Sequence, residues 1–433
     1  MKAKHWVFSA LLLATGVQFA AAQLVNGRFA TSFYSWKQYD TVGIGVNYLR
    51  AYQTIQLSVA QGDVALHTYL MAAAGGTSDV GRVRAYNLYV DWSNIDSVLD
   101  LSLGRQAIYA GVGNGTIDGL RASARFLENK VRVTAYAGAG VNPDFTGIRK
   151  NIHDNNSFGG QVVTTAVENL RFGLSYMNRH EEKDPYWTLR ARDSSFVPVP
   201  YYIANENQAE QYGSADASYS YGSLLSVYGR YDYDFNLSRT FRGQGWARVN
   251  VTDALAFTGE YMYRAPRVAY NSIFSVFTLN SVNELEGGVE YTFTPALRAF
   301  ARYANVKYSD DRNNRWTVGL NTTYGSFSYS GSDGYAGQLQ ALSIQGAYPV
   351  LDRLVTPTLG ISYASYRFSS DSPRDDALAL LVGAVLRPSR AFSADVQGQL
   401  MANRVYRNDM RLQVRLMYWF AERLSIFSQE VDQ

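Results

Sequence analysis

The chain has 433 residues, a formal net charge of +3 and no cysteine. So small a charge leaves no basic excess for binding nucleic acid. The missing cysteines exclude disulfides, thiolate metal sites, a lipid-modified cysteine and covalent haem attachment.

The first 22 residues have the pattern of a secretory signal peptide. Lys2 and Lys4 form a positive start, 7–14 is apolar, and alanines 20–22 fit a small-residue cleavage site. We therefore expect a mature chain of residues 23–433, a single β-barrel domain with a formal charge of +1 once the two lysines are removed. Beyond the signal, no continuous apolar run reaches the roughly 20 residues of a membrane-spanning helix.

A glycine-rich segment early in the chain combines a strand end, a loop and a strand start. Gly104-Arg105-Gln106 ends one predicted strand and Asp118-Gly119 opens the next, with the loop predicted over 107–117. No helix follows the glycines, so a dinucleotide-binding site is not indicated. Arg105 and Asp118 are the candidate entrance residues, and we expect them to lie close together and to hold the loop.

This G-R-Q…D-G element resembles one found in several families of large Gram-negative porin-like barrels. The resemblance covers roughly residues 24–140, and beyond them only the strand alternation continues. It implies a barrel in which the element lies near the extracellular mouth and its arginine and aspartate shape the entrance.

The segment 180–208 is the longest predicted connection, with charges at its start and prolines at 185, 198 and 200. It is either a surface loop or one that folds inward as a constriction or binds a partner.

The clearest hairpin in the sequence runs from Glu284 to Tyr303. Apolar and polar residues alternate along both arms, which indicates strands with two different faces. The polar face is acidic on the first arm and basic on the second. A closed barrel in lipid explains this pattern, because apolar residues face acyl chains while charged residues line a watery lumen.

Short turns and longer connections alternate along the chain, as in bacterial outer-membrane barrels. The spacing predicts an all-β, transmembrane antiparallel barrel of about 22 strands, within a range of 20 to 24. The end of the chain leaves an ambiguity. If 421–423 is a turn like 294–296, then 424–431 would be a further strand and the total would be odd; otherwise 421–433 is a tail.

Assigning faces by alternation predicts a mixed set of charged side chains that line the lumen. The predicted pore-lining residues are Arg121, Arg125, Arg132, Arg171, Arg230, Arg248, Glu260, Arg264, Glu284, Glu286, Glu290, Arg298, Arg302, Asp395, Arg411 and Arg415. Each can equally be an ordinary solvated or cross-strand-paired charge. Together they set the potential of a pore.

Catalysis is not indicated, since no spacing brings serine, histidine and an acid together. We predict neither cofactor nor metal. The sequence favours an outer-membrane channel of a Gram-negative bacterium that passes small hydrophilic solutes or ions by diffusion. Its partners would be outer-membrane lipid, lipopolysaccharide and the barrel-assembly machinery. The alternative is a structural sleeve that holds a partner protein in its lumen, such as a multihaem electron carrier or an export apparatus.

Overall fold

The computed structural model describes residues 23–39, 45–75, 83–142, 144–148, 151–182, 186–191, 198–203, 209–267, 280–309, 311–369, 371–405 and 408–424. The predicted signal peptide, residues 1–22, lies outside this part of the chain. No helix in the described part is long and apolar enough to cross a membrane.

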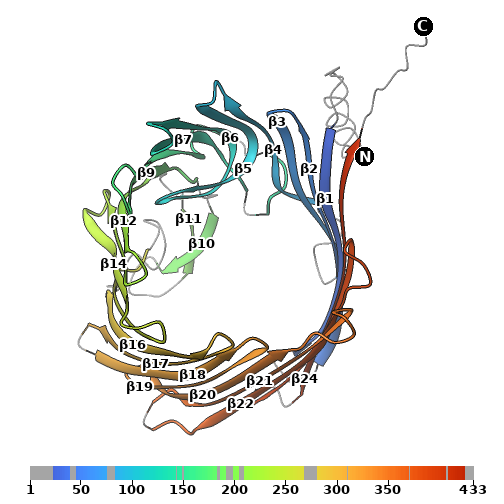
Figure 1. Ribbon diagram of the computed structural model, residues 1–433, viewed down its shortest axis with the longest axis vertical. Coiled ribbons are helices and arrows are strands. Elements are labelled where there is room, and N and C mark those ends of the chain that lie inside the picture. Colours follow the sequence, from blue (N-terminus) through green and yellow to red (C-terminus); the bar gives the residue numbers. More distant parts are fainter. Residues whose placement is uncertain are drawn as a thin grey trace.

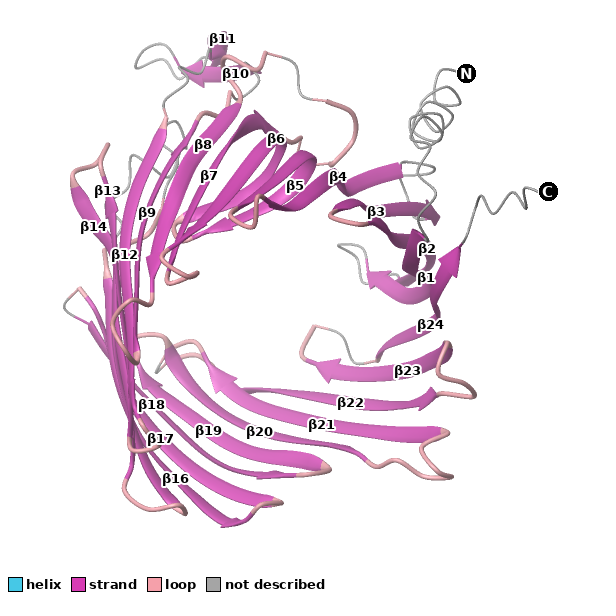
Figure 2. Cartoon of the chain, turned by 45° about the horizontal axis from the view of Figure 1, so that its top comes forward, coloured by secondary structure: helices cyan, strands magenta, loops and turns pink. Residues whose placement is uncertain are grey.

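Twenty-two strands form one sheet, and two more form a separate hairpin (Figures 1 and 2). The first eleven strands of the sheet are β1 (Gln23–Tyr39), β2 (Gly45–Gln61), β3 (Val64–Gly75), β4 (Val83–Ile95), β5 (Leu99–Ala110), β6 (Gly113–Phe126), β7 (Val131–Gly140), β8 (Asn156–Thr164), β9 (Leu170–Arg179), β12 (Glu210–Tyr221) and β13 (Leu225–Asp234). The other eleven are β14 (Arg239–Asn250), β15 (Leu255–Arg264), β16 (Val282–Thr294), β17 (Leu297–Tyr308), β18 (Asp311–Thr322), β19 (Gly325–Gly334), β20 (Gly337–Ala347), β21 (Val355–Arg367), β22 (Asp375–Leu386), β23 (Phe392–Asn403) and β24 (Asp409–Leu424). The separate hairpin is β10 (Tyr186–Ala191) with β11 (Pro198–Ile203).

The sheet closes on itself because β1 pairs antiparallel with both β2 and β24. Along the rest of the ring each strand pairs with its chain neighbour, except that β9 pairs with β12 across the β10–β11 insertion. The predicted closed antiparallel barrel of about 22 strands is confirmed.

The two faces of the wall differ as the sequence alternation predicted. On the outer face, large apolar side chains are exposed along many strands; examples are Val90, Leu103, Leu174, Leu285 and Val382. Among the described strands of the ring, each pairs with two neighbours, although β4 lacks β5 as a partner before Leu88. An even strand number, an apolar outer surface and paired strands are the features of a bacterial outer-membrane barrel.

At the chain end, residues 421–424 form neither the expected turn nor the start of the alternative tail. β24 continues to Leu424 and stays paired with β1 as far as Gln23. Phe420 stacks on Phe29 of β1, with ring centroids 5.5 Å apart. The segment resembles the 294–296 turn in spacing but has no proline, and β1 offers it backbone partners. The expected further strand at 424–431 lies outside the described part of the chain except for Leu424, which belongs to β24.

The predicted loop 107–117 is also wrong in extent. β5 runs to Ala110 and β6 begins at Gly113, which leaves a turn of only Gly111 and Val112. Two of its glycines have the positive φ that other residues rarely adopt, +65° at Gly111 in the turn and +125° at Gly115 in β6.

Candidate pore lining and constriction

The β5–β6 hairpin leaves the wall and enters the lumen (Figure 1). β4 and β5 pair only as far as Leu88 opposite Arg105, after which β5 turns away. Gly104 makes the bend with φ of +126°, and a Cβ there would lie 2.4 Å from the Leu88 carbonyl oxygen. At Gly119 on β6 a side chain would also clash with the backbone, since a Cβ there would lie 2.2 Å from the Ala137 oxygen. Only glycine suits either position.

Arg105 joins the bent hairpin to two neighbouring segments. Its Nε and Nη2 donate to the two carboxylate oxygens of Asp118, both at 2.7 Å. Its Nη1 donates to the backbone oxygens of Ala85 and Phe145, each at 3.1 Å, and Nη2 also donates to the oxygen of Gly147. Only 8% of the Arg105 side chain is exposed, so this planar two-pronged pair is shielded from water. The two predicted entrance residues therefore lie together.

The tip of the hairpin is anchored against the inner face of the wall at β9. The backbone N–H of Val112 donates to the Ser175 hydroxyl on β9 at 2.8 Å. The Val112 side chain is buried in an apolar cluster with Met177, Tyr212, Phe241 and Ala265. The hairpin is thus held at its base by a charge pair and at its tip by packing.

Beside this tip lies a cavity of about 820 Å³ with an excess of basic residues. Two of its arginines are neutralised, because Arg171 pairs with Asp216 and Arg230 pairs with Asp232 at 2.8 Å. The other three, Arg242, Arg264 and Arg267, form no ion pair at contact distance with a described acidic residue.

The three arginines without an ion pair are held by other contacts; Arg264 donates to the sulfur of Met262 at 3.1 Å. Arg267 stacks on the rings of Phe241 and Tyr212, 4.0 and 4.6 Å from their centroids. Burial lowers the pKa of the Arg267 guanidinium, which nonetheless stays charged at neutral pH. Arg242 donates to Gln244, which in turn donates to Glu260 at 2.7 Å. The cavity therefore carries a net positive charge.

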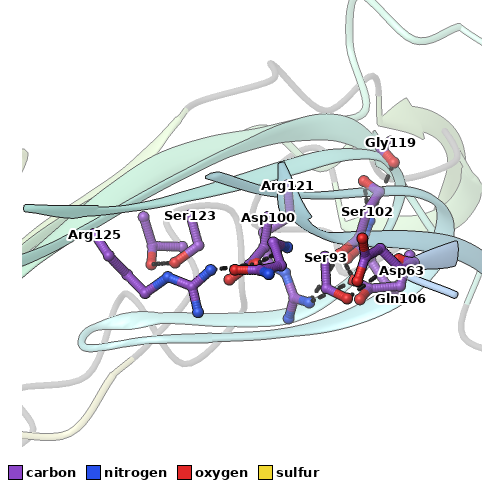
Figure 3. Close-up of polar contacts among 12 residues, drawn as sticks. Asp63, Ser93, Asp100, Ser102, Gln106, Gly119, Arg121, Ser123 and Arg125 are labelled. Carbon is purple, nitrogen blue, oxygen red and sulfur yellow. Dashed lines mark hydrogen bonds and ion pairs between the residues drawn. The ribbon is translucent and has the colours of Figure 1, made fainter. Parts of the chain in front are cut away.

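The register places all sixteen predicted pore-lining residues on one face of the sheet, the face toward the hairpin tip. Most of the arginines among them are paired. Along the β5–β6 hairpin, Arg125 binds Asp100 at 3.0 Å and Arg121 donates to the Ser102 hydroxyl at 2.9 Å (Figure 3). Gln106 donates to the Ser102 and Gly119 backbone oxygens at 3.0 and 3.2 Å, which completes this polar row.

On β14 to β18 the charges form two clusters. Glu290 lies 2.7 Å from Arg248, 3.5 Å from Arg302 and 3.8 Å from Arg298. Arg315 of β18 binds both Glu284 and Glu286. The acids of β16 therefore neutralise arginines on both sides.

The remaining predicted residues are less closely paired. Arg411 binds Asp409 at 2.9 Å, and Asp395 accepts from Gln397 at 3.1 Å. Arg415 lies opposite Asp395 in the register without an ion pair at contact distance within the described part, and Arg132 likewise has none there.

Sequence reasoning missed six charged residues of these groups: Asp100, Asp216, Arg242, Arg267, Arg315 and Asp409. All but Arg267 could have been found, since they have the inward phase of the strand alternation. Arg267 lies beyond the end of β15, where alternation gives no signal.

The predicted long connection 180–208 contains the β10–β11 hairpin. Figure 2 shows this hairpin beyond the ends of β8 and β9, and Figure 1 shows it within the outline of the ring. It therefore lies over part of the barrel mouth.

The chain matches no protein-family model and no curated protein. Among solved structures it is similar to the P pilus usher PapC translocation pore, with 10% identity, a TM-score of 0.48, and coverage of 92% of this chain and 99% of that one. It is also similar to OpdQ of Pseudomonas aeruginosa (9% identity, TM-score 0.41, 92% and 98% coverage) and to OccAB1 of Acinetobacter baumannii (9%, 0.41, 92% and 96%). These values are too low to assign a family or a solute.

Proposed function

We propose that the chain is a channel of the Gram-negative outer membrane through which small hydrophilic solutes or ions diffuse. The β5–β6 hairpin carries the proposal: it narrows the lumen from inside and is fixed at both ends. A narrowed, polar lumen restricts solutes by size while it stays wet.

The inner charges support passage without strong preference for one sign. Most arginines are neutralised by nearby acids, as around Glu290. The net positive cavity beside the hairpin tip adds a modest preference for anions. Arg105 and Asp118 would act at the entrance by holding the narrowing in place.

The sleeve interpretation has less support. A partner protein would need the lumen that the β5–β6 hairpin occupies, and the hairpin tip is packed against the wall rather than free. Membrane lipid, lipopolysaccharide and the barrel-assembly machinery are the partners that a channel would require.

Liposome swelling tests the proposal. Proteoliposomes with the purified chain should admit small sugars and amino acids quickly and admit them more slowly as solute size rises. Empty liposomes made with the same detergent are the control. Swelling no faster than in the control, for every solute, would contradict diffusion through this barrel.

A further inference from the structure

The inner wall formed by β1 to β4 and β24 differs from the charged wall opposite. The register places aromatic rings on the inner face of all five strands. These rings are Tyr34, Trp36, Tyr48, Tyr52, His67, Tyr69, Tyr89 and Trp419. Aromatic residues of outer-membrane barrels ordinarily anchor the outer face at the lipid interface. Lipid contact cannot explain rings that face the lumen.

The rings form a track along the wall. Near the end with the long connections, Trp36 stacks on Tyr34 and Tyr48, with centroids 5.2 and 5.4 Å apart. Further along, Tyr69 stacks on Tyr86 at 5.0 Å.

The track continues into the half of the barrel with the short turns. There His67 stacks on Tyr89 at 5.0 Å, and Trp419 lies opposite Arg28 in the register. Trp419 is 37% exposed, so its ring is open to a solute.

A cavity of about 740 Å³ lies along the part of this track nearer the short turns. Tyr69, Tyr89 and Trp419 line it, and its polar lining includes Arg28, Gln56, Asn87 and Arg390. Arg28 brings a guanidinium to this cavity. A guanidinium carries only N–H donors, so it favours a ligand with acceptor oxygens.

This composition points to one chemical class. Aromatic faces cover the apolar C–H face of a sugar ring, while amide groups both donate to and accept from its hydroxyls. A simple anion would make no use of the rings. An aromatic carboxylate such as benzoate could pair with the guanidinium but has no donor for the amide oxygens of Gln56 and Asn87.

We propose that this wall is a binding track for carbohydrate, with its main site at Tyr89, Trp419 and Arg28. The proposal rests on the channel function, since it names the solute class that the lumen would favour.

Single-channel recording with malto-oligosaccharides tests the proposal. Maltotriose to maltohexaose, added to a conducting wild-type channel, should reduce the ion current in a saturable way. Tyr89→Ala and Trp419→Ala should each raise the half-blocking concentration by about five- to tenfold, as expected for the loss of one aromatic contact. Tyr89→Phe keeps the ring and should stay close to wild type. Tyr291→Ala removes an exposed ring from the outer face and is the matched control.

Several results would contradict the carbohydrate track. These are a conducting channel that the sugars do not block, equal block of wild type and both alanine variants, or block by benzoate but not by sugar. Absence of any current would instead contradict the channel. The track would then be tested by titrating the detergent-purified protein with maltohexaose in a calorimeter, where wild type should bind and Trp419→Ala should bind at least fivefold more weakly. Equal affinities, or no heat of binding to wild type, would overturn the proposal.

Discussion

Arg105 connects β5 to β6, β4 and the segment after β7 through bonds that are shielded from water. Arg105→Ala leaves Asp118 charged and mostly buried, with 19% of its side chain exposed. Breaking such a pair costs about 3–5 kcal/mol, so we expect a looser hairpin and noisier single-channel currents. Arg125→Ala, which breaks a pair on the same hairpin away from the bend, is the control. If the single-channel currents and the stability of the variant equalled those of wild type, the Arg105–Asp118 pair would not be what holds the hairpin in place.

Gly104 is the residue that lets β5 leave β4. Gly104→Ala combines a positive φ with a clash against the Leu88 oxygen, and we expect a loss of about 1–3 kcal/mol. The measurement is the unfolding midpoint in guanidinium, together with the gel-mobility shift of the folded barrel. Gly245→Ala is the control, because its added Cβ would meet no atom within 4 Å. Equal effects of the two substitutions would argue against a bend that depends on Gly104.

Individual strands were the most predictable elements, because a wall between lipid and water imposes a period of two on each of them. The β16–β17 hairpin, with its turn at Pro295 and Ala296, matches the sequence interpretation closely. The inward β5–β6 hairpin was not predictable. Its path depends on Val112 meeting an apolar cluster of residues distant in sequence, and alternation carries no information about such contacts.

The β16–β17 hairpin allows a direct test of the two faces of the wall. Single cysteines at Leu285 and Val289 should resist a membrane-impermeant thiol reagent, whereas cysteines at Glu286 and Arg298 should react. The chain has no cysteine of its own, so background labelling should be absent. Val289→Arg should destabilise the barrel by about 2–4 kcal/mol if Val289 lies at mid-bilayer. Similar labelling at all four positions would contradict the assignment of faces.

Across the whole molecule, charge is balanced by pairing rather than by separate rows. Replacing Glu284, Glu286 and Glu290 by Gln frees Arg248, Arg298, Arg302 and Arg315 from their carboxylates. Selectivity should shift towards anions without loss of current, since salt screens the field beyond roughly 8–10 Å. Reversal potentials in a salt gradient measure this shift. Asp253→Asn, in a short turn after β14, is the control. An unchanged reversal potential in the triple variant would remove these acids from the conduction path.

The closed barrel, its even strand number and its inner face follow from local patterns repeated along the chain. The narrowing of the lumen does not, because it arises from contacts between β5–β6 and β9, β14 and the end of β15. The aromatic inner wall of β1 to β4 and β24 could be predicted only in part. Its rings have the inward phase in the sequence, but tyrosine in a barrel equally suits the lipid interface, so composition alone could not place them.

Planar-bilayer conductance of the wild-type chain and of a shortened hairpin tests the central claim most directly. In the variant, Asn-Gly replaces residues 107–116, which joins the facing residues Gln106 and Ile117 through a two-residue turn. The Arg105–Asp118 pair is retained. We expect wild type to conduct in steps that rise nearly in proportion to bulk salt, and the variant to conduct in larger steps. No conductance from repeated insertions of folded wild type, or equal steps from both proteins, would contradict a channel narrowed by this hairpin.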